Sequence, residues 1–192
     1  QYTPFFQNYA LTEFNAGNQN WGISKAENGR LYVANDKGLV EFDGLKWDFY
    51  QLPNKTIMRS VLAFKDVIYT GSYEEFGYWK KNIKGKLFYT SLSNFKDKRV
   101  SLDEEFWQIF HHNGAILFRS FSNLYSYKNG EINRIKPKST ILSCSVIDDE
   151  IYVSTVRDGI FILENDSLKP FLNDSTLYNA KVVSIAKYQN KI

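Results

Sequence analysis

The amino-acid sequence predicts an all-β fold made of β-propeller blades: four four-stranded antiparallel blades and the start of a fifth. Three observations lead to this prediction. A set of short apolar strands recurs along the chain, polar turns lie at the same place in each copy, and several strands are continuous apolar runs. Four antiparallel strands in a repeat of roughly 40 residues are typical of a propeller blade.

The first two strands of each copy, and the turn between them, set the phase of the repeat. The centres of the second strands recur at spacings of 37, 48 and 35 residues, at Tyr32, Tyr69, Leu117 and Tyr152. The turns before these strands are polar in every copy, at residues 27–30, 65–66, 112–114 and 148–149. Asn-Gly and related pairs supply the positive φ that tight hairpins require. We therefore expect an antiparallel hairpin at the start of each copy.

A third and a fourth strand complete each copy. The third strand follows a short loop and the fourth a further turn, which gives blades at about 15–53, 54–92, 105–137 and 141–173. The runs Ile116–Phe118, Ile151–Val153 and Ile160–Leu163 are apolar at consecutive positions. Strands covered on both faces have this pattern, and stacked blades cover both faces of their inner strands.

A fifth copy begins at Val182–Ala186 and occupies residues 180–192, where the sequence ends. Propellers typically close with four to eight blades, and an open arc would expose a blade face and a sheet edge. We therefore expect the chain to be the N-terminal part of a larger propeller of about seven blades. Its partners would then be the remaining blades or a second copy of the chain. Residues 5–14, ahead of the first blade, would supply an outer strand that completes the last blade of the ring.

Charge and composition exclude several classes of protein. The 24 basic and 21 acidic residues give a net charge of +3 without long runs of either sign, so direct nucleic-acid binding by this segment is not expected. No stretch approaches the roughly 18 apolar residues of a spanning helix, so we expect no membrane insertion by this segment. The single cysteine, Cys144, excludes an internal disulfide and a cysteine metal cluster, and is expected to be a buried small residue. The only histidines, His111 and His112, are adjacent and point to opposite faces of a strand, so neither a metal site nor a cofactor is predicted.

The first copy resembles a known repeat. Residues 28–44, which read NGRLYVANDKGLVEFDG, resemble the repeat of the two-component regulator propeller family, and residues 123–127 and 159–163 are weaker copies. The chain departs from that repeat where the family has tryptophan, at Tyr32, Tyr69, Leu117 and Tyr152. One subgroup is more similar still, in residues 16–21, 71–79 and 118–122. These are the sensor regions of membrane-anchored regulators with a triple-tyrosine domain and a helix-turn-helix or histidine-kinase output.

The resemblance implies a function as well as a fold. Members of the family carry the propeller outside the inner membrane, which implies a periplasmic, extracytoplasmic location. There the propeller senses a ligand, and a transmembrane helix passes the signal to a DNA-binding or histidine-kinase domain. In the hybrid-kinase branch the ligands are often polysaccharide fragments, so the implied partner is a small ligand that is derived from a glycan.

The loops around the central channel are where we expect the ligand to bind. Second-to-third-strand loops and interblade loops lie on one face of a propeller, and loops on a rigid scaffold commonly carry function. On this face aromatic rings are combined with charged groups, at Trp21, Arg59, Tyr73, Glu74, Glu75, Trp107, Arg119, Phe121, Arg157 and Asp158. Rings stack on a sugar-like or zwitterionic ligand, and charged groups orient it. Packing between blades is the alternative role for Trp21 and Trp107, and the long connection Ser93–Glu105 is either a second specificity element or a surface excursion.

The predicted function is therefore a non-enzymatic, ligand-sensing propeller without catalytic residues. Ligand binding would shift the population toward one arrangement of the propeller against the following domain. Two alternatives stay open. One is a propeller carbohydrate hydrolase or lyase that uses Glu74 or Glu75, since a glycosidase needs two carboxyls about 5 to 10 Å apart. The other is a scaffold that only binds protein partners.

Overall fold

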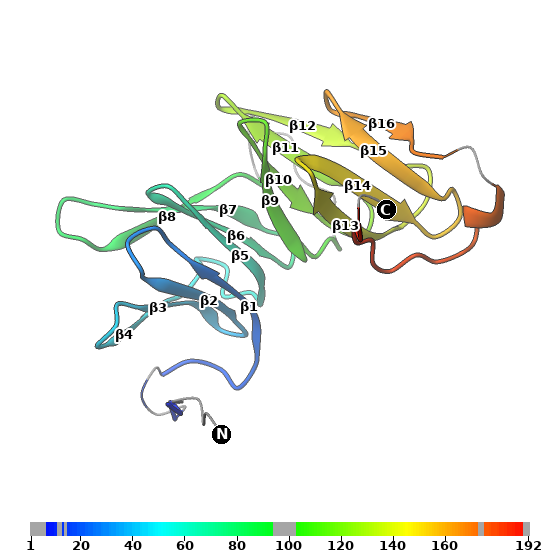
Figure 1. Ribbon diagram of the computed structural model, residues 1–192. Helices are drawn as coiled ribbons and strands as arrows, with labels where there is room; N and C mark the ends of the chain where they lie inside the picture. Colours follow the sequence, from blue (N-terminus) through cyan, green and yellow to red (C-terminus); the bar gives the residue numbers. More distant parts are fainter. Residues whose placement is uncertain (1–6, 11–12, 14, 94–102, 173–174, 190–192) are drawn as a thin grey trace, which may run out of the picture.

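The computed structural model describes residues 7–10, 13, 15–93, 103–172 and 175–189. In these residues it contains four separate sheets, each of four antiparallel strands in sequence order. The sheets follow one another in an arc, with β1, β5, β9 and β13 on its inner side (Figure 1). The predicted all-β fold of four propeller blades is confirmed.

Every blade is a meander of four short strands. Blade one consists of β1 (Asn20–Lys25), β2 (Leu31–Asn35), β3 (Gly38–Phe42) and β4 (Trp47–Tyr50). Blade two consists of β5 (Met58–Phe64), β6 (Val67–Ser72), β7 (Phe76–Lys81) and β8 (Leu87–Ser91). Blade three consists of β9 (Gln108–His112), β10 (Ala115–Arg119), β11 (Leu124–Lys128) and β12 (Glu131–Ile135). Blade four consists of β13 (Ile141–Ile147), β14 (Glu150–Thr155), β15 (Ile160–Glu164) and β16 (Ser167–Pro170).

The turns between the first two strands have the backbone that the sequence predicts. Gly29, Lys65 and Asn113 have φ angles of 84°, 52° and 48°. In blade four, Asp148 and Asp149 follow each other with φ angles of 49° and 61°. Asn and Asp tolerate this left-handed region better than most residues, because their short side chains can hydrogen-bond locally. The in-phase turns are therefore confirmed as the feature that closes each inner hairpin.

The start of a fifth blade does not form a strand. Val182–Ala186 has no partner strand among the described residues, so it lacks the ladder of backbone hydrogen bonds that defines one. The Val182 carbonyl oxygen instead accepts hydrogen bonds from the hydroxyls of Ser143 and Ser154. Val182 and Ile185 also pack against the cluster around Tyr152. The segment therefore covers the free face of blade four, where a following blade would pack, but without strand structure.

The N-terminal segment was expected to supply an outer strand. Of residues 5–14, those that are described form no strand, and residues 5, 6, 11, 12 and 14 lie outside the described residues. The Tyr9 ring packs on Phe42 and Trp47 of blade one, with centroids 5.3 and 5.1 Å away. This part of the segment therefore lies against blade one. Residues 94–102 of the long connection between blades two and three also lie outside the described residues.

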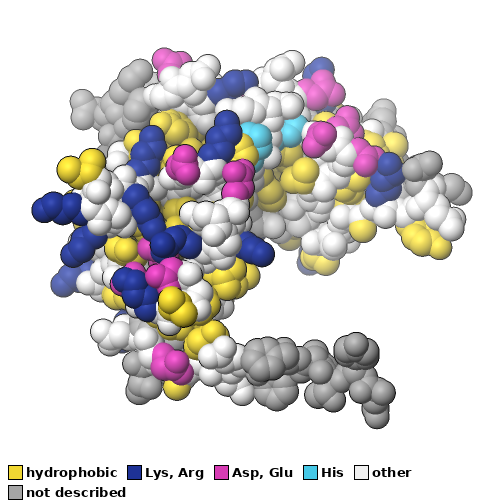
Figure 2. Space-filling view, turned by 60° about the vertical axis from the view of Figure 1, so that its left-hand side comes forward, with side chains coloured by type: hydrophobic (Ala, Val, Ile, Leu, Met, Phe, Trp, Pro, Cys, Tyr) yellow, Lys and Arg dark blue, Asp and Glu magenta, His cyan; other side chains and the backbone are white. Residues whose placement is uncertain are grey.

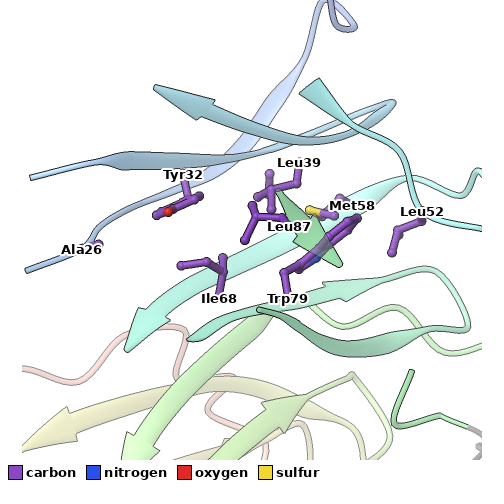
Figure 3. Close-up of a cluster of buried hydrophobic side chains, with 9 residues drawn as sticks. Ala26, Tyr32, Leu39, Leu52, Met58, Ile68, Trp79 and Leu87 are labelled. Carbon is purple, nitrogen blue, oxygen red and sulfur yellow. The ribbon is translucent and has the colours of Figure 1, made fainter. Parts of the chain in front are cut away.

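Each blade buries apolar side chains against the next one. Between blades one and two they point toward one another from both sheets (Figure 3), in the cluster Ala26, Tyr32, Ala34, Leu39, Leu52, Met58, Ile68, Trp79 and Leu87. Between blades two and three, the Phe76 ring lies 4.6 Å from the centroids of both Phe106 and Phe118. Between blades three and four, Cys144 is 5% exposed, and burial raises the pKa of its thiol to about 12. The predicted role of Cys144 as a buried small residue is confirmed.

An extra residue interrupts the start of the inner strands. The pairing of β1, β5 and β13 with their second strands shifts by one residue, at Trp21, Arg59 and Leu142. Such a bulge bends the strand and re-aims the side chain that it carries. Trp107 occupies the matching place just before β9, where its N–H donates to the Arg119 carbonyl oxygen at 2.9 Å. Trp21, Arg59 and Trp107 thus occupy equivalent positions at the start of the inner strands of three successive blades, the first two of them at bulges.

Blades two and three approach most closely where β6 ends. A Cβ added at Gly71 would lie 2.6 Å from both the Phe106 Cβ and the Ser60 Oγ, and 2.8 Å from the Phe106 carbonyl oxygen. The Ser60 hydroxyl donates to that same carbonyl oxygen at 2.7 Å, so the backbone of blade three is fixed against blade two. A larger residue at this position would have to push blade three away.

Gly71→Val is expected to lower the free energy of unfolding by about 1–3 kcal/mol, because overpacking forces a backbone shift. Denaturant unfolding followed by tryptophan fluorescence measures this change. The matched control is Gly22→Ala, since a Cβ there lies 3.7 Å or more from its nearest neighbours. The control should change stability by less than about 0.5 kcal/mol. Equal effects of the two substitutions would contradict the close contact at Gly71.

A buried carboxylate also joins blades one and two. Glu41 on β3 is 1% exposed and accepts hydrogen bonds from Arg30 Nη1 at 3.0 Å and from the Tyr32 hydroxyl at 3.1 Å. It also accepts from the Tyr50 hydroxyl at 3.2 Å and from Lys81 Nζ on β7 of the neighbouring blade. Burial and then the charge of Glu41 raise the pKa of Tyr50 to about 12. The Glu41 carboxylate therefore ties the outer parts of the two blades together.

Glu41→Gln is expected to lower the free energy of unfolding by about 3 kcal/mol, because Arg30 and Lys81 lose their common counter-charge. It should also lower the pKa of Tyr50, which a phenolate absorbance titration measures. In the wild type the unfolded state releases the Tyr50 proton first, so stability falls as the pH rises from about 10 to about 12. The variant should lose less stability over that interval.

The control for this substitution is Glu164→Gln. Glu164 pairs with Lys169 at the surface, and their side chains are 45% and 63% exposed. Exposed pairs contribute about 0–1 kcal/mol, so this variant should unfold almost like the wild type. A Glu41→Gln variant that is as stable as the control would show that the carboxylate does not join the blades.

Candidate functional site

A stack of three side chains crosses the inner ends of blades one, two and three. The Arg59 guanidinium lies against both indole rings, with Cζ 4.2 Å from the centroid of Trp21 and 4.7 Å from that of Trp107. The two indoles meet edge to face at 5.9 Å. Trp21 and Arg59 occupy the bulge positions of their blades and Trp107 the matching place just before β9, so the repeat of the fold creates this cluster. A cation over an aromatic face is attracted by the ring quadrupole, and most strongly when it is partly desolvated.

Two acidic residues fix the stack in place. Trp21 Nε1 donates to Asp36 Oδ1 at 2.8 Å, and Arg59 Nη2 donates to Glu105 Oε1 at 2.9 Å. The Arg59 side chain is only 12% exposed, whereas Trp21 remains 41% exposed. Asp36 and Glu105 therefore fix the positions of Trp21 and Arg59, while the Trp21 indole stays partly exposed to solvent.

The stack continues toward blade four. The centroid of the Trp107 ring lies 5.7 Å from that of Phe121. Phe121 also contacts Arg119, whose Cζ lies 5.5 Å from the Phe121 centroid. Phe121 is 47% exposed and Arg119 6% exposed. Five of the ten predicted site residues thus form one continuous row, here called the channel row: Trp21, Arg59, Trp107, Phe121 and Arg119.

Tyr73 and Glu74 support the channel row from the side. The Tyr73 hydroxyl donates to Asp103 Oδ1 at 2.9 Å, and this hydrogen bond raises the pKa of Tyr73 to about 12. Glu74 Oε1 accepts from the Asp103 N–H at 2.9 Å. Tyr73 also forms a β-bridge with Glu105, the partner of Arg59. These two residues therefore position Glu105, and they reach the row only through it.

Glu75 lies apart from the channel row. It is 8% exposed and its Oε1 accepts from the Tyr89 hydroxyl at 2.9 Å and from Ser91 Oγ at 2.8 Å. Its neighbours belong to the outer strand of blade two. Burial, and after it the charge of Glu75, raise the pKa of Tyr89 well above its ordinary value. The structure thus gives Glu75 a place inside blade two, where it links strands.

Arg157 and Asp158 lie on blade four, at a different place. They line a hollow of about 700 Å³ together with the basic side chains Arg134, Lys136 and Lys138. Arg157 is exposed, and Asp158 Oδ2 is buried without a hydrogen-bond partner. The structure therefore does not bring these two predicted residues to the channel row.

Sequence reasoning did not single out the acidic residues that hold the row. Asp36 lies in a loop that was expected on this face, and its pairing with Trp21 follows from the bulge in β1. Glu105 lies 46 residues after Arg59, so no local pattern connects the two. In the part of the chain that is described, no group of three or more His, Cys, Asp or Glu residues could hold a metal ion. The described residues also contain no helix long and apolar enough to cross a membrane.

The sequence matches no protein-family model and no curated protein. Among solved structures, the chain is similar to the extracellular domain of a hybrid two-component system from B. thetaiotaomicron, with a TM-score of 0.63 and 16% identity. The match covers 90% of this chain and 24% of that one, so the chain spans about a quarter of that domain.

Two other solved structures extend the comparison. The WD40 β-propeller domain of Doa1 matches with a TM-score of 0.61 and 10% identity, over 82% of this chain and 57% of that one. Virginiamycin B lyase from Staphylococcus aureus matches with a TM-score of 0.58 and 15% identity, over 78% of this chain and 55% of that one.

These likenesses agree with the resemblance drawn from the sequence. At identities of 10–16% they establish the fold, which is that of propellers with very different roles. The chain is thus an arc of β-propeller blades similar to the extracellular domains of two-component systems.

A double-mutant cycle tests the central contact of the row. Trp21→Leu and Arg59→Met should show a coupling of about 0.5–1 kcal/mol in the free energy of unfolding, because each removes the same cation–π contact. Chemical denaturation of the two single variants and the double variant measures it. Trp21→Leu combined with Arg134→Met is the control, since Arg134 lies on the outer strand of blade three. A coupling no larger than that of the control would refute the contact.

Proposed function

We propose that the chain is the ligand-sensing propeller of an extracytoplasmic signalling protein, and that it binds a small, glycan-derived ligand on the channel row. The row supports this proposal because aromatic faces remain exposed in it, 41% at Trp21 and 47% at Phe121, with a guanidinium against the indoles. Aromatic faces stack on sugar rings while polar groups set the orientation. The row is also rigid, which reduces the ordering cost of binding.

The likeness to an extracellular two-component domain supports the proposed location. It supports a periplasmic position and a role in signal transduction, in which ligand binding changes the arrangement of the propeller against a transmembrane segment. That segment would pass the signal to a DNA-binding or histidine-kinase domain and so regulate transcription.

The free face of blade one supports partners beyond the described arc. It exposes Ile23 to 67% and has a hollow of about 570 Å³ beside Trp21, Val33 and Trp47. An apolar blade face of this kind is buried between blades two and three, and between three and four. We therefore propose that further blades, or a second copy of the chain, cover it.

The alternative of a carbohydrate-active enzyme has less support. It relied on Glu74 or Glu75, and both carboxylates bond to other groups of the chain, Glu74 to the Asp103 N–H and Glu75 to two hydroxyls. Glu75 is also only 8% exposed, which keeps its carboxylate away from a substrate at the surface. The likeness to a lyase concerns the fold, which is shared by proteins without that activity.

Binding to a panel of neutral and acidic oligosaccharides, measured by isothermal titration calorimetry, tests the proposal. Trp21→Ala and Phe121→Ala are each expected to lower the affinity for the bound ligand at least tenfold, because a stacking face is lost. Phe88→Ala is the control, since Phe88 is an aromatic residue on the outer strand β8 that is 59% exposed. No binding to any member of the panel, or binding that ignores both substitutions, would overturn the proposed function.

A further inference from the structure

The junction between blades three and four differs from the others in the side chains at its channel end. There, one residue of the inner strand and one of the second strand form a pair that faces the next blade. In blades one, two and four both residues of the pair are small: Gly22–Ala34, Ser60–Gly71 and Ser143–Ser154. In blade three both are large: Gln108–Arg119. The inner strand β5 lies against both β1 and β9, whereas β13 stands farther from β9. The large pair thus lies where successive blades are least closely joined.

Arg119 is buried at this junction, and two of its three guanidinium nitrogens have no hydrogen-bond partner. It is 6% exposed, and the two nitrogens are Nε and Nη1. The Oε1 of Gln108 and the Nε1 of Trp107 are buried and unpartnered in the same way. The neighbouring Cys144 thiol offers no negative charge at neutral pH, because burial raises its pKa to about 12. Among the described residues, no carboxylate pairs with Arg119.

An unpaired guanidinium inside a protein is costly. Arginine stays protonated even when burial lowers its pKa, as it does for Arg119. Buried charges and buried N–H groups almost always have partners, and those that lack one often mark a binding site. An oxyanion satisfies such donors best, and a planar carboxylate matches the geometry of a guanidinium.

We propose that Arg119 and Trp107, whose unpartnered groups are N–H donors, form an anion subsite at the end of the channel row, and that the ligand carries a carboxylate. The carboxylate would bind Arg119, and the ring beside it would stack on Phe121, whose centroid is 5.5 Å from the Arg119 Cζ. An acidic sugar has both parts in the required order. This inference rests on the proposed function and names the chemical class of its ligand.

Glucuronate and glucose are the probes, because they differ only in the C6 carboxylate. Thermal unfolding of the full chain is measured with each sugar at equal concentration, and sodium chloride matches the ionic strength of the glucose sample. Glucuronate is expected to raise the melting temperature of the wild type by several degrees more than glucose, since binding to the native state stabilises it. In Arg119→Met this difference should vanish, and in Arg119→Lys, which keeps the charge but loses the planar donors, it should shrink.

Two controls separate this subsite from general effects. Arg134→Met removes an exposed positive charge and should keep the full difference between the two sugars. Without sugar, Arg119→Met should melt at or above the wild-type temperature, because it removes an unpaired buried charge. A residue with a purely structural role would behave in the opposite way.

The outcomes decide between the two levels of the proposal. Equal shifts by glucuronate and glucose in the wild type, zero included, would overturn the anion subsite, as would a difference that persists in Arg119→Met. A glucuronate effect that needs Arg119 but ignores Trp21→Ala and Phe121→Ala would uphold the subsite and overturn the proposed use of the aromatic row. Loss of the effect in all three variants would support both.

Discussion

Blades two and three meet so closely at the channel end that β6 must finish in a small side chain, and the channel row depends on this contact. At Gly71 the backbone of Phe106 leaves no room for a Cβ. The Ser60 hydroxyl donates to the Phe106 carbonyl oxygen, so the chain of blade three is held in place just before its inner strand begins. Trp107 comes directly after Phe106, and it takes the place that the bulge residues Trp21 and Arg59 have in blades one and two. The fold and the channel row therefore share one origin.

The loop residues Tyr73 and Glu74 on the channel face position the residues of the channel row. Tyr73 and Glu74 hold residues 103–105, and Glu105 in turn holds Arg59 against its two indoles. A ligand on the row would thus meet groups whose positions are set by two further layers of hydrogen bonds. A ligand can shift an equilibrium between two states only if it binds one of them better than the other. Groups in fixed positions make such a difference in affinity larger, because they fit the ligand in one arrangement only.

The sequence allowed the architecture to be predicted because its signals are local. The polar turns fix each hairpin by positive φ at Lys65, Asn113 or Asp148, and the strands between them follow. The predicted row residues came from the same phase, since the starts of the inner strands and the loops between the second and third strands recur with it. Other features could not be predicted, because they depend on distant partners. From its place in the sequence Glu75 is an exposed loop carboxylate, whereas in the structure it is buried and accepts hydrogen bonds from Tyr89 and Ser91 of another strand. Val182–Ala186 has the composition of a strand, but a strand also requires a partner.

Two buried charges show how structure and function separate in this chain. Glu41 and Arg119 are 1% and 6% exposed, so both have given up most of their hydration. The Glu41 carboxylate replaces its lost hydration with hydrogen bonds from two cations and two hydroxyls. One of the cations, Lys81, belongs to the next blade. Arg119 recovers none of it through Nε and Nη1. Burial with full pairing ties blades together, whereas burial without pairing keeps a charge ready for a group from outside. The large pair Gln108–Arg119 stands at the junction where β13 lies farther from the neighbouring inner strand than β5 does, so the unpaired donors belong to the less tightly joined part of the arc.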